Sequence, residues 1–429
     1  MRHVVVGASA AGLAAAEAIL SIDPAAHVTL LTEEPHPPYC RPLISYWLAQ
    51  EIPEDRFPLP SPVLSRVELR TGVRAVALDP EGRRLELASG ERLAYDRLCL
   101  ATGAASKPLG LEGEGAPNVF GFRTRDDARG IAEEIDRGAR RALVLGGGLV
   151  GVKAALALAA RGVETRLCIA SPHPLSQTVD EGAGALVAAA LEEAGVRVAA
   201  GWKPQGLRVE GGRVTAVGFA PGPRWEPCDL VIRGKGVAPR VELFEALGAG
   251  SAQGVATDET LATPLPHVWA AGDAVLSFDL AWERPRLHAI WPAAVEQGTV
   301  AGRNMAGARE SYPGSLAMNA VKIGDLFAVS VGIVRPPEGP YAVRTRREPA
   351  RRLYRRVVTR QGRLVGAVFA GPDDGAAGVH QAGLLVSAVR AGRRADELPF
   401  DPLEDRIHWG RVACAAAVAP APASAPPCP

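Results

Sequence analysis

Two segments of the chain share one order of apolar and polar positions. Residues 3–20 read HVVVGASAAGLAAAEAIL, and residues 141–158 read RALVLGGGLVGVKAALAL. In each segment a short apolar run of strand length is followed by a glycine-containing turn and then by a stretch rich in Ala and Leu. The pattern predicts a buried strand, a tight turn and a helix, twice in the same chain.

The turns indicate what these two units bind. The first turn has Gly7, Ser9 and Gly12 at its key positions, and the second has glycines at all three, Gly146, Gly148 and Gly151. Glycine permits a tight turn and lets the backbone approach a pyrophosphate, whose charge is favoured at a helix N-terminus. Two such units predict two dinucleotides and electron transfer between them.

The remaining pattern is rich in strands. Residues 28–34, VTLLTEE, predict a second strand that ends in acidic residues. Further strand-like segments cover 67–95, 95–104 and 255–274. The character changes near residue 306, beyond which apolar and polar positions alternate as in antiparallel strands over 320–334, 341–346 and 351–370, with a turn at 360–362. The Ala- and Pro-rich tail 411–429 predicts extended or disordered chain.

Composition narrows the classes of protein that fit. With 429 residues, 47% hydrophobic and 22% charged, the chain has the size and balance of a globular protein of two or three domains. The net charge of +1 gives no reason to expect nucleic acid or an anionic membrane as partner. Apolar runs long enough to span a membrane do not occur. We therefore expect no membrane span.

The cysteines and histidines exclude several kinds of site. The six cysteines form no CxxC or CxxxxC pair, and the eight histidines show no HxxxH or HExxH spacing. We expect no metal site and no local redox disulfide. This cysteine usage suits a reducing compartment, and we expect a cytoplasmic protein.

Two further motifs identify a family. ATG at 101–103 and TPLPHVWAAGDA at 263–274, taken in order with the two glycine turns, resemble the motifs of FAD/NAD(P)H-dependent pyridine nucleotide-disulfide oxidoreductases. The resemblance covers roughly residues 1–305. It implies an α/β fold with two Rossmann-like dinucleotide-binding domains, in which the FAD domain is split by the NAD(P)H domain, plus a small α+β C-terminal domain.

Domain boundaries follow from that resemblance. They place the FAD-binding domain at 1–110 and 234–305, the NAD(P)H-binding domain at 111–233, the C-terminal domain at 306–410 and a tail at 411–429. In this family the C-terminal domain serves for dimer contact or for capping the flavin. A homodimer is therefore among the expected arrangements.

The resemblance also implies the residues that hold the cofactors. Asp273 is expected to bind the ribitol of FAD. An acidic residue after the second strand is expected to bind the adenosine ribose of FAD. Thr32 stands at the usual position of that acid, so we assign the ribose-binding role to the next residue, Glu33, with Glu34 as the alternative. The expected FAD contacts are Gly7, Ser9, Ala10, Ala11, Gly12, Glu33, Arg41, Pro42, Ala75, Ala101, Thr102, Gly103, Gly272, Asp273 and Trp291. The expected nicotinamide-nucleotide contacts are Gly146, Gly148, Leu149, Val150, Gly151 and Gly236.

The second unit departs from the family pattern. The family's ribose-binding acid falls at Ile169 here, and the nearby basic residues Arg166 and His173 form no clear NADP phosphate site. We expect NADH as the nucleotide, with NADPH as the alternative. Lys153 stands where many family members carry a glutamate; it is either a surface residue or a contact to the nicotinamide region.

The position of the family's redox disulfide also differs. The segment PPYCRPLISYWLAQE, residues 37–51, carries only Cys40. Its PYCRP resembles rubredoxin and ferredoxin reductases, the flavin module of nitrite reductase and the flavoprotein subunit of phenylglyoxylate dehydrogenase, in which an arginine lies close to FAD and no protein disulfide takes part. Cys40 is either a small buried residue beside the cofactor or a reactive thiolate assisted by Arg41.

These features favour one function and leave others open. We expect an FAD-dependent NAD(P)H oxidoreductase that passes electrons between a nicotinamide nucleotide and a protein electron carrier, ferredoxin- or rubredoxin-like, or a larger oxidoreductase complex. The alternative is a stand-alone oxidase, peroxidase or disulfide reductase that uses Cys40. A third possibility is an FAD protein that has lost turnover.

Two other features have alternative explanations. His288 lies near the expected flavin but is equally explained as scaffold. The arginine cluster at 344–356 predicts a solvated strand face or, alternatively, a docking site for an acidic electron carrier.

Overall fold

The computed structural model describes residues 1–222, 224–372 and 379–404 and forms two compact units. The first unit comprises residues 1–177 and 187–317, and the second comprises residues 178–186 and the chain from Met318 onward. Both predicted nucleotide-binding segments lie in the first unit. The domain boundaries at residues 110 and 233 that the sequence suggested remain predictions.

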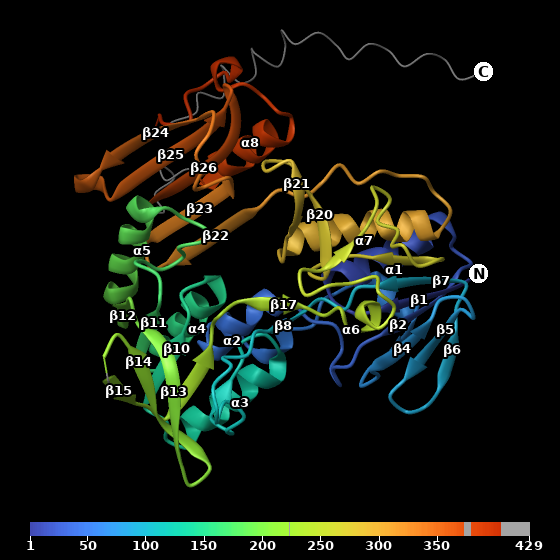
Figure 1. Cartoon of the computed structure of the whole chain (residues 1–429), viewed down its shortest axis with the longest axis horizontal. Coiled ribbons are helices and arrows are strands. Elements are labelled where there is room, and N and C mark those ends of the chain that lie inside the picture. The colour runs from blue at the N-terminus through green and yellow to red at the C-terminus, as the bar shows by residue number, and fades with distance from the viewer. Residues whose placement is uncertain (223, 373–378, 405–429) are drawn as a thin grey trace. The chain divides into compact units, whose positions relative to one another are not determined.

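The first predicted strand–turn–helix unit is part of a parallel sheet with the order β19-β7-β1-β2-β3 (Figure 1). These strands are β1 (Arg2–Val6), β2 (His27–Leu31), β3 (Glu68–Arg70), β7 (Arg97–Leu100) and β19 (Val268–Ala270). All neighbouring pairs in it are parallel. β1 lies between β2 and β7, so the turn after β1 opens at the carboxyl edge of the sheet, where doubly wound folds bind their ligands.

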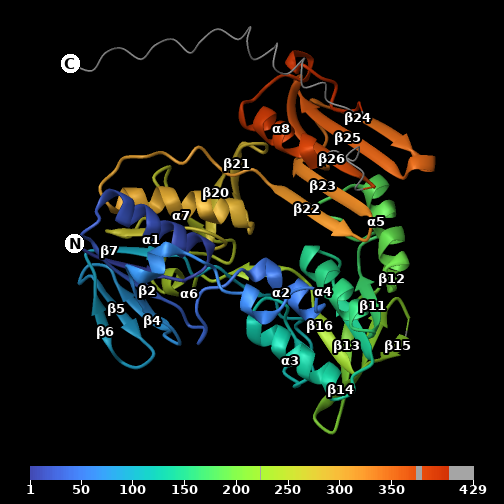
Figure 2. The same cartoon turned by 180° about the vertical axis from the view of Figure 1, so that it is seen from behind.

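Helix α1 (Ala10–Ile22) follows this turn and packs closely against helix α7 (Trp291–Met305), as both views show (Figures 1 and 2). Side chains at two glycines of α7 would not fit: a Cβ at Gly298 would lie 2.1 Å from the carbonyl oxygen of Ala11, and one at Gly302 would lie 2.3 Å from that of Ala15. The Ala-rich face of α1 and the glycines of α7 together permit this short separation.

The second predicted unit is part of a separate parallel sheet with the order β12-β11-β10-β16-β9. Its strands are β9 (Val119–Phe120), β10 (Arg141–Leu145), β11 (Glu164–Ile169), β12 (Val196–Ala200) and β16 (Leu230–Arg233), and its helices are α3 (Arg125–Asp136), α4 (Leu149–Ala160) and α5 (Glu181–Glu193). The central strand β10 pairs with β11 and β16 in parallel. This arrangement repeats that of β1 between β2 and β7.

Smaller elements complete the first unit. Antiparallel sheets are formed by β4 (Ala75–Asp79), β5 (Arg84–Leu87) and β6 (Arg92–Ala94), and by β13 (Lys203–Glu210), β14 (Arg213–Ala220) and β15 (Arg224–Pro227). A third small sheet contains β18 (Val255–Ala256), β20 (Val275–Asp279) and β21 (Arg284–Leu287). β8 (Ala104–Ser106) pairs with β17 (Val237–Pro239), and short helices occur at η1 (Arg41–Leu43), α2 (Ile44–Leu48), η2 (Glu54–Arg56), η3 (Pro62–Ser65) and α6 (Glu242–Glu245).

The second unit contains the predicted antiparallel strands. They form a sheet with the order β22-β23-β26-β25-β24, and helix α8 (Val379–Arg390) and two short helices, η4 (Pro349–Arg351) and η5 (Ala395–Glu397), belong to the same unit. The strands are β22 (Met318–Ile323), β23 (Leu326–Gly332), β24 (Tyr341–Glu348), β25 (Leu353–Arg360) and β26 (Arg363–Pro372). The predicted turn at 360–362 joins β25 to β26, so this α+β prediction is confirmed.

The arginine cluster of this unit forms the predicted solvated face in part, because Arg344, Arg347 and Arg351 are exposed while Arg355 is not. Arg355 is fully buried, and its guanidinium donates to the carbonyl oxygens of Pro402 and Glu404. Arg346 donates to the carbonyl oxygen of Leu403 at 2.9 Å. The cluster therefore holds the chain's own segment 401–404. Arg344 takes part too, with an ion pair to Asp401 at 2.7 Å.

Together these elements confirm the predicted fold class of Rossmann-like α/β units followed by an α+β segment. Within the described ranges, none of the helices combines the length and apolar character that crossing a membrane requires. The tail 411–429, with Cys414 and Cys428, lies outside the described residues.

Candidate functional site: two dinucleotide-binding turns

The first turn has no room for side chains at its first and last glycines. Gly7 has φ +111°, and its N–H donates to the carbonyl oxygen of Leu31 at 2.8 Å. A Cβ at Gly7 would lie 2.1 Å from the carbonyl oxygen of Ala101, and one at Gly12 would lie 1.7 Å from that of Gly7. The ATG segment therefore packs directly on the glycine turn, and two of the predicted FAD motifs are in contact.

The second turn repeats this construction. Gly146 has φ +125°, and a Cβ there would lie 2.3 Å from the carbonyl oxygen of Gly234. A Cβ at Gly151 would lie 1.9 Å from the carbonyl oxygen of Gly146. At Gly148, by contrast, no described heavy atom comes within 4 Å of the added Cβ. The open space beside Gly148 is where a bound pyrophosphate can approach the backbone.

The helices after the two turns leave their first N–H groups available. In the described part of the chain, neither Ser9, the N-cap of α1, nor Gly148, the N-cap of α4, caps its helix with a side chain. Helix α3 differs, because Thr124 and Asp127 form a capping box at its start. Uncapped N–H groups at a positive helix end favour an anion. Both turns therefore fit the pyrophosphate of a dinucleotide.

The two units also match in register at the ribose-binding position. Val6 pairs with Leu31 in the first sheet, and Leu145 pairs with Cys168 in the second. Thr32 and Ile169 are thus equivalent positions, and neither is acidic. Thr32 is followed by the acidic residues Glu33 and Glu34, whereas Ile169 is followed by Ala170 and Ser171.

The basic residues near the second ribose position are already engaged. Arg166 forms an ion pair with Glu226 at 2.5 Å and stacks over the ring of Trp202 at 5.4 Å. His173 is buried, and its Nδ1 lies 2.8 Å from the carbonyl oxygen of Pro174. Neither side chain is directed to a 2′-phosphate, which agrees with the expectation of NADH.

The AAGD turn is held from within the core. Gly272 has φ +85°, and its N–H donates to Oε1 of the fully buried Gln297 at 2.8 Å. The amide nitrogen of Gln297 donates to the hydroxyls of Ser277 and Ser315, each at 3.2 Å. Gln297 therefore fixes the backbone next to Asp273, and the sequence motifs did not single it out.

Arg123 is a second residue that the sequence did not single out. Its Nη2 donates to Oδ2 of Asp273 at 2.8 Å, although the two residues are 150 positions apart. A Cβ at Gly103 would lie 3.7 Å from the same nitrogen. Arg123 thus lies between two predicted FAD motifs, the inner ATG and the AAGD turn. Its position in FRTRDD, before a capped helix, was the available signal.

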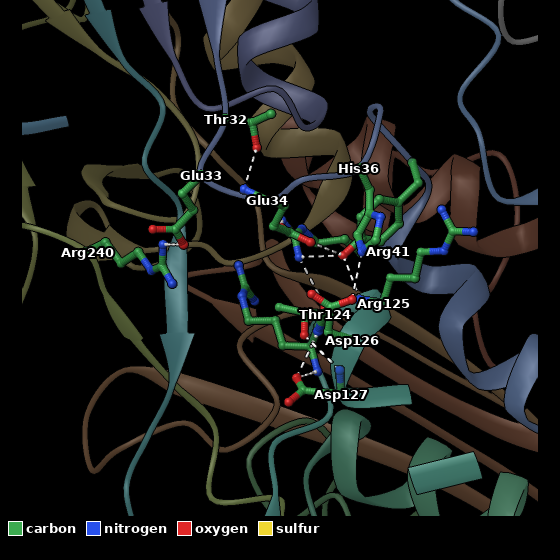
Figure 3. A network of polar contacts seen from close by, with 12 residues as sticks. Thr32, Glu33, Glu34, His36, Arg41, Thr124, Arg125, Asp126, Asp127 and Arg240 are labelled. Carbon is green, nitrogen blue, oxygen red and sulfur yellow. Dashed lines mark hydrogen bonds and ion pairs between the residues drawn. The ribbon is translucent and has the colours of Figure 1, made fainter. Parts of the chain in front are cut away.

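A polar network around Glu34 joins the loop after β2 to the start of α3 (Figure 3). Glu34 accepts from the hydroxyl of Tyr39 at 2.6 Å and pairs with Arg41. Arg41 also donates to the carbonyl oxygen of Arg123 at 3.1 Å. Burial, opposed by the charge of Arg41, raises the pKa of Tyr39, so its phenol stays protonated as a donor to Glu34. Arg41 therefore lies among the predicted FAD motifs.

The outer edge of this network is formed by α3 and the segment before it. Arg125 donates its backbone N–H to the Tyr39 hydroxyl at 2.9 Å and pairs with Glu54 through its side chain. His36 lies 2.7 Å from Asp126. These contacts hold the loop that carries Cys40 and Arg41 against the N-terminus of α3.

For the remaining predicted residues the structure gives the place in the fold but no contact that defines a role. Pro42 is exposed in η1, Ala75 begins β4, and Trp291 begins α7. Gly236 has φ +86° and follows β16. His288 is buried and lies 2.8 Å from the carboxylate of Asp279, which is the scaffold explanation of this histidine.

Comparison with known proteins decides the family. The model of the pyridine nucleotide-disulphide oxidoreductase family matches residues 1–298 of the chain. The chain belongs to this family. FAD and NAD(H) are accordingly its cofactors, and it is an oxidoreductase.

Individual relatives in this family are similar over much of the chain. The NADH-dependent phenylglyoxylate dehydrogenase subunit epsilon of Aromatoleum evansii is 29% identical over 93% of this chain and 93% of its own length. The biphenyl dioxygenase system ferredoxin–NAD(+) reductase component of Paraburkholderia xenovorans is 35% identical over 63% of this chain and 66% of its own. A solved structure, a NAD-dependent persulfide reductase from A. fulgidus, has a TM-score of 0.83 and 25% identity, covering 93% of this chain and 78% of that one.

Cys40, the single cysteine in the region where the family's disulfide reductases carry their redox pair, is not set up as a thiolate. Burial raises the pKa of the Cys40 thiol, although a backbone N–H bond from Leu43 opposes this. The neighbouring Arg41 is directed to Glu34 and Tyr39. The four cysteines of the described ranges, Cys40, Cys99, Cys168 and Cys228, are free thiols.

Lys153, at the family's glutamate position, links the two halves of the site. Its Nζ donates to the hydroxyl of Tyr46 at 3.2 Å and lies 4.7 Å from the centroid of that ring. Tyr46 is on α2, directly after the predicted FAD contacts Arg41 and Pro42, and Lys153 is on α4, directly after the second glycine turn. The surface-residue interpretation of Lys153 is therefore incomplete.

Proposed function

We propose that this chain is an NADH-dependent flavoprotein reductase that passes electrons between NAD(H) and a separate protein without using a cysteine. The partner is a ferredoxin- or rubredoxin-like carrier or a larger oxidoreductase complex. FAD, when held by the first glycine turn and Asp273, would supply the hydride and electron chemistry, while the chain's own residues position it. The observation that carries the proposal is the segment 37–51, which holds only one cysteine in the region where the family's disulfide reductases carry a CxxxxC pair.

The roles of the chain's own residues follow from the geometry. The uncapped starts of α1 and α4 bind two pyrophosphates, and the closely packed glycines keep the turns rigid. Arg123 pairs with Asp273 at the predicted ribitol site, and the pair orients the ribitol of FAD. Lys153 and Tyr46 hold α4 against α2, which fixes the separation of the two nucleotides.

The relatives support a protein partner. One is a subunit of an NADH-dependent dehydrogenase and matches nearly the whole of this chain, and another is the ferredoxin–NAD(+) reductase component of a dioxygenase system. Since the first of these relatives matches 93% of this chain and 93% of its own length, we assign the same kind of role here.

A variant at Cys40 tests the proposal. Cys40→Ser removes the thiol with little change in size, and Cys99→Ser, at a fully buried cysteine, controls for general damage to the fold. We expect Cys40→Ser to retain the parent rate of NADH-driven reduction of an artificial dye and of an added [2Fe–2S] ferredoxin. A loss of more than tenfold with intact FAD content would refute the thiol-independent mechanism.

A second function is favoured by one specific observation. Cys40 is partly accessible and precedes η1, and the solved structure of similar fold and 25% identity is a persulfide reductase. In that case the chain reduces a small sulfur compound or oxygen by itself through Cys40. The Cys40→Ser variant separates the two functions, because only the second requires the thiol.

We also propose a cytoplasmic location and a homodimer. The cysteine usage supports a reducing compartment, and the antiparallel sheet of the second unit supplies a surface of the kind that this family uses for dimer contact. Light scattering at a range of protein concentrations tests the dimer, and a mass of one chain at all of them would exclude it.

A further inference from the structure

Arg240 is fixed by its backbone on a turn that we assign to FAD. Its N–H donates to the carbonyl oxygen of Gly103 at 2.9 Å, and its own carbonyl oxygen accepts from the hydroxyl of Thr102 at 2.7 Å. It follows β17, which pairs with β8 directly after the ATG segment. Neither backbone contact involves the guanidinium, so residue 240 keeps this place whatever side chain it carries.

The side chain of Arg240 extends from the ATG turn to the end of β2. There its Nη1 forms an ion pair with Oε1 of Glu33, 207 positions away in sequence (Figure 3). The two side chains are 35% and 38% exposed. An ion pair this exposed contributes little to folding stability. Its placement beside the predicted adenosine ribose site points to ligand binding instead.

The charges around this pair explain why a cation is needed. FAD brings a doubly negative pyrophosphate to the start of α1, and Glu33 and Glu34 add two carboxylates at the neighbouring strand end. Glu34 is neutralised by Arg41. Glu33 is neutralised by Arg240. Without Arg240 the carboxylate of Glu33 would be free to rotate and would repel the pyrophosphate.

We propose that Arg240 is a positioning residue that makes the site selective for FAD over FMN. It holds the carboxylate of Glu33 in place to accept hydrogen bonds from the adenosine ribose, and it offsets the negative charge of that carboxylate. FMN shares the ring, the ribityl chain and one phosphate with FAD but has no adenosine. FMN therefore does not reach Glu33, and its binding is independent of Arg240.

The test compares the two flavins on one set of variants. Dissociation constants for FAD and for FMN are measured by flavin fluorescence on the full chain after removal of bound FAD. The variants are Arg240→Ala, Arg240→Lys, Glu33→Gln and the double variant Arg240→Ala/Glu33→Gln. The matched control is Arg208→Ala, an exposed arginine that stacks over Trp225 at 4.6 Å away from the FAD motifs.

We expect Arg240→Ala to weaken FAD binding about tenfold, the size of one charge-assisted contact, and to leave FMN binding unchanged. Arg240→Lys should recover part of the loss, because it keeps the charge. In the Glu33→Gln background the alanine substitution should have little further effect on FAD binding, since Arg240 acts through Glu33. Arg208→Ala should bind both flavins as the parent does.

Three results would overturn the proposal: unchanged FAD affinity in Arg240→Ala, equal loss of FAD and FMN affinity, or tighter FAD binding. Thermal unfolding of the flavin-free variants checks the fold. If Arg240→Ala unfolds at a lower temperature, the ratio of FAD to FMN affinity in Glu33→Gln decides, because that change removes only the charge. A parent-like ratio in Glu33→Gln would also overturn the proposal.

Discussion

Gly148 separates nucleotide binding from folding better than any other position in the second turn. It has φ −73° and ψ 177°, a conformation open to every residue type, and no described heavy atom lies within 4 Å of a Cβ built on it. An alanine therefore fits the nucleotide-free chain without strain. We expect Gly148→Ala to change the free energy of unfolding by less than about 1 kcal/mol, because the entropy that alanine removes from the unfolded chain is offset by its poorer fit at the N-cap of α4.

The same methyl group fills the space that a pyrophosphate needs. If it separates one phosphate oxygen from the N–H groups at the start of α4, a charge-assisted hydrogen bond worth about 1.5–3 kcal/mol is lost. That loss corresponds to a roughly 10- to 150-fold higher Kd for NADH at 25 °C. FAD content should not change, because Gly148 belongs to the second turn.

The assay pairs NADH titration with thermal unfolding of the FAD-loaded protein. Gly115→Ala is the matched control, since a Cβ there also meets no described atom within 4 Å but lies outside both turns. Gly146→Ala is the contrast, because a Cβ there would lie 2.3 Å from the carbonyl oxygen of Gly234 and should lower the unfolding temperature. If Gly148→Ala binds NADH as tightly as the parent, the second turn is not the pyrophosphate site.

Three further predictions concern buried or linking residues. Burial lowers the pKa of His3 from 6.5 to about 4, so only the unfolded chain takes up a proton at this residue between pH 6.5 and pH 4. The free energy of unfolding should therefore fall by about 3 kcal/mol as the pH drops from 6.5 to 4. Urea titrations at both pH values should show that His3→Val removes this loss. Gln297→Leu leaves the Gly272 N–H without its acceptor, so it should lower the free energy of unfolding by about 1–3 kcal/mol and speed the release of FAD. Gln297→Glu keeps an acceptor and should retain FAD. Equal retention of FAD by both variants would contradict the positioning role of Gln297. Lys153→Met should change the free energy of unfolding by under about 1 kcal/mol but should slow the reduction of the flavin by NADH several-fold in stopped flow. The reduction rate of Tyr46→Phe should lie between those of Lys153→Met and the parent. Unchanged rates would show that the pair does not align the two nucleotides.

The sequence predicted the parts of the structure that local chain chemistry determines. The two glycine turns have backbone conformations and contacts that glycine alone accommodates, and the alternation in 351–370 forms the expected β25–β26 hairpin. The order of motifs also placed Asp273 and Gly103 near one another, because parallel strands bring their carboxyl ends to one edge. These features depend on neighbours close in sequence or on a recurring topology.

The sequence did not predict contacts between distant polar side chains. Arg123 meets Asp273 across 150 positions, and Arg240 meets Glu33 across 207. For Arg123 the only local signal was its position before the capped helix α3, and nothing in the local pattern distinguishes Arg240 from the exposed arginines. In the arginine cluster at 344–356 the sequence did not distinguish the buried Arg355 from its exposed neighbours for the same reason, since the carbonyl groups that bury Arg355 come from residues 402 and 404.

Stoichiometric reduction of the FAD-loaded protein by NADH under anaerobic conditions tests the central claim most directly. NADH delivers two electrons and FAD accepts two, so a site without a redox-active thiol should bleach fully with one equivalent of NADH, in the parent and in Cys40→Ser alike. The reduced flavin should then be reoxidised by an added oxidised [2Fe–2S] ferredoxin. A requirement for two equivalents in the parent that falls to one in Cys40→Ser would contradict the account, because the Cys40 sulfur would then start as a sulfenic acid or mixed disulfide that two further electrons reduce to the thiol.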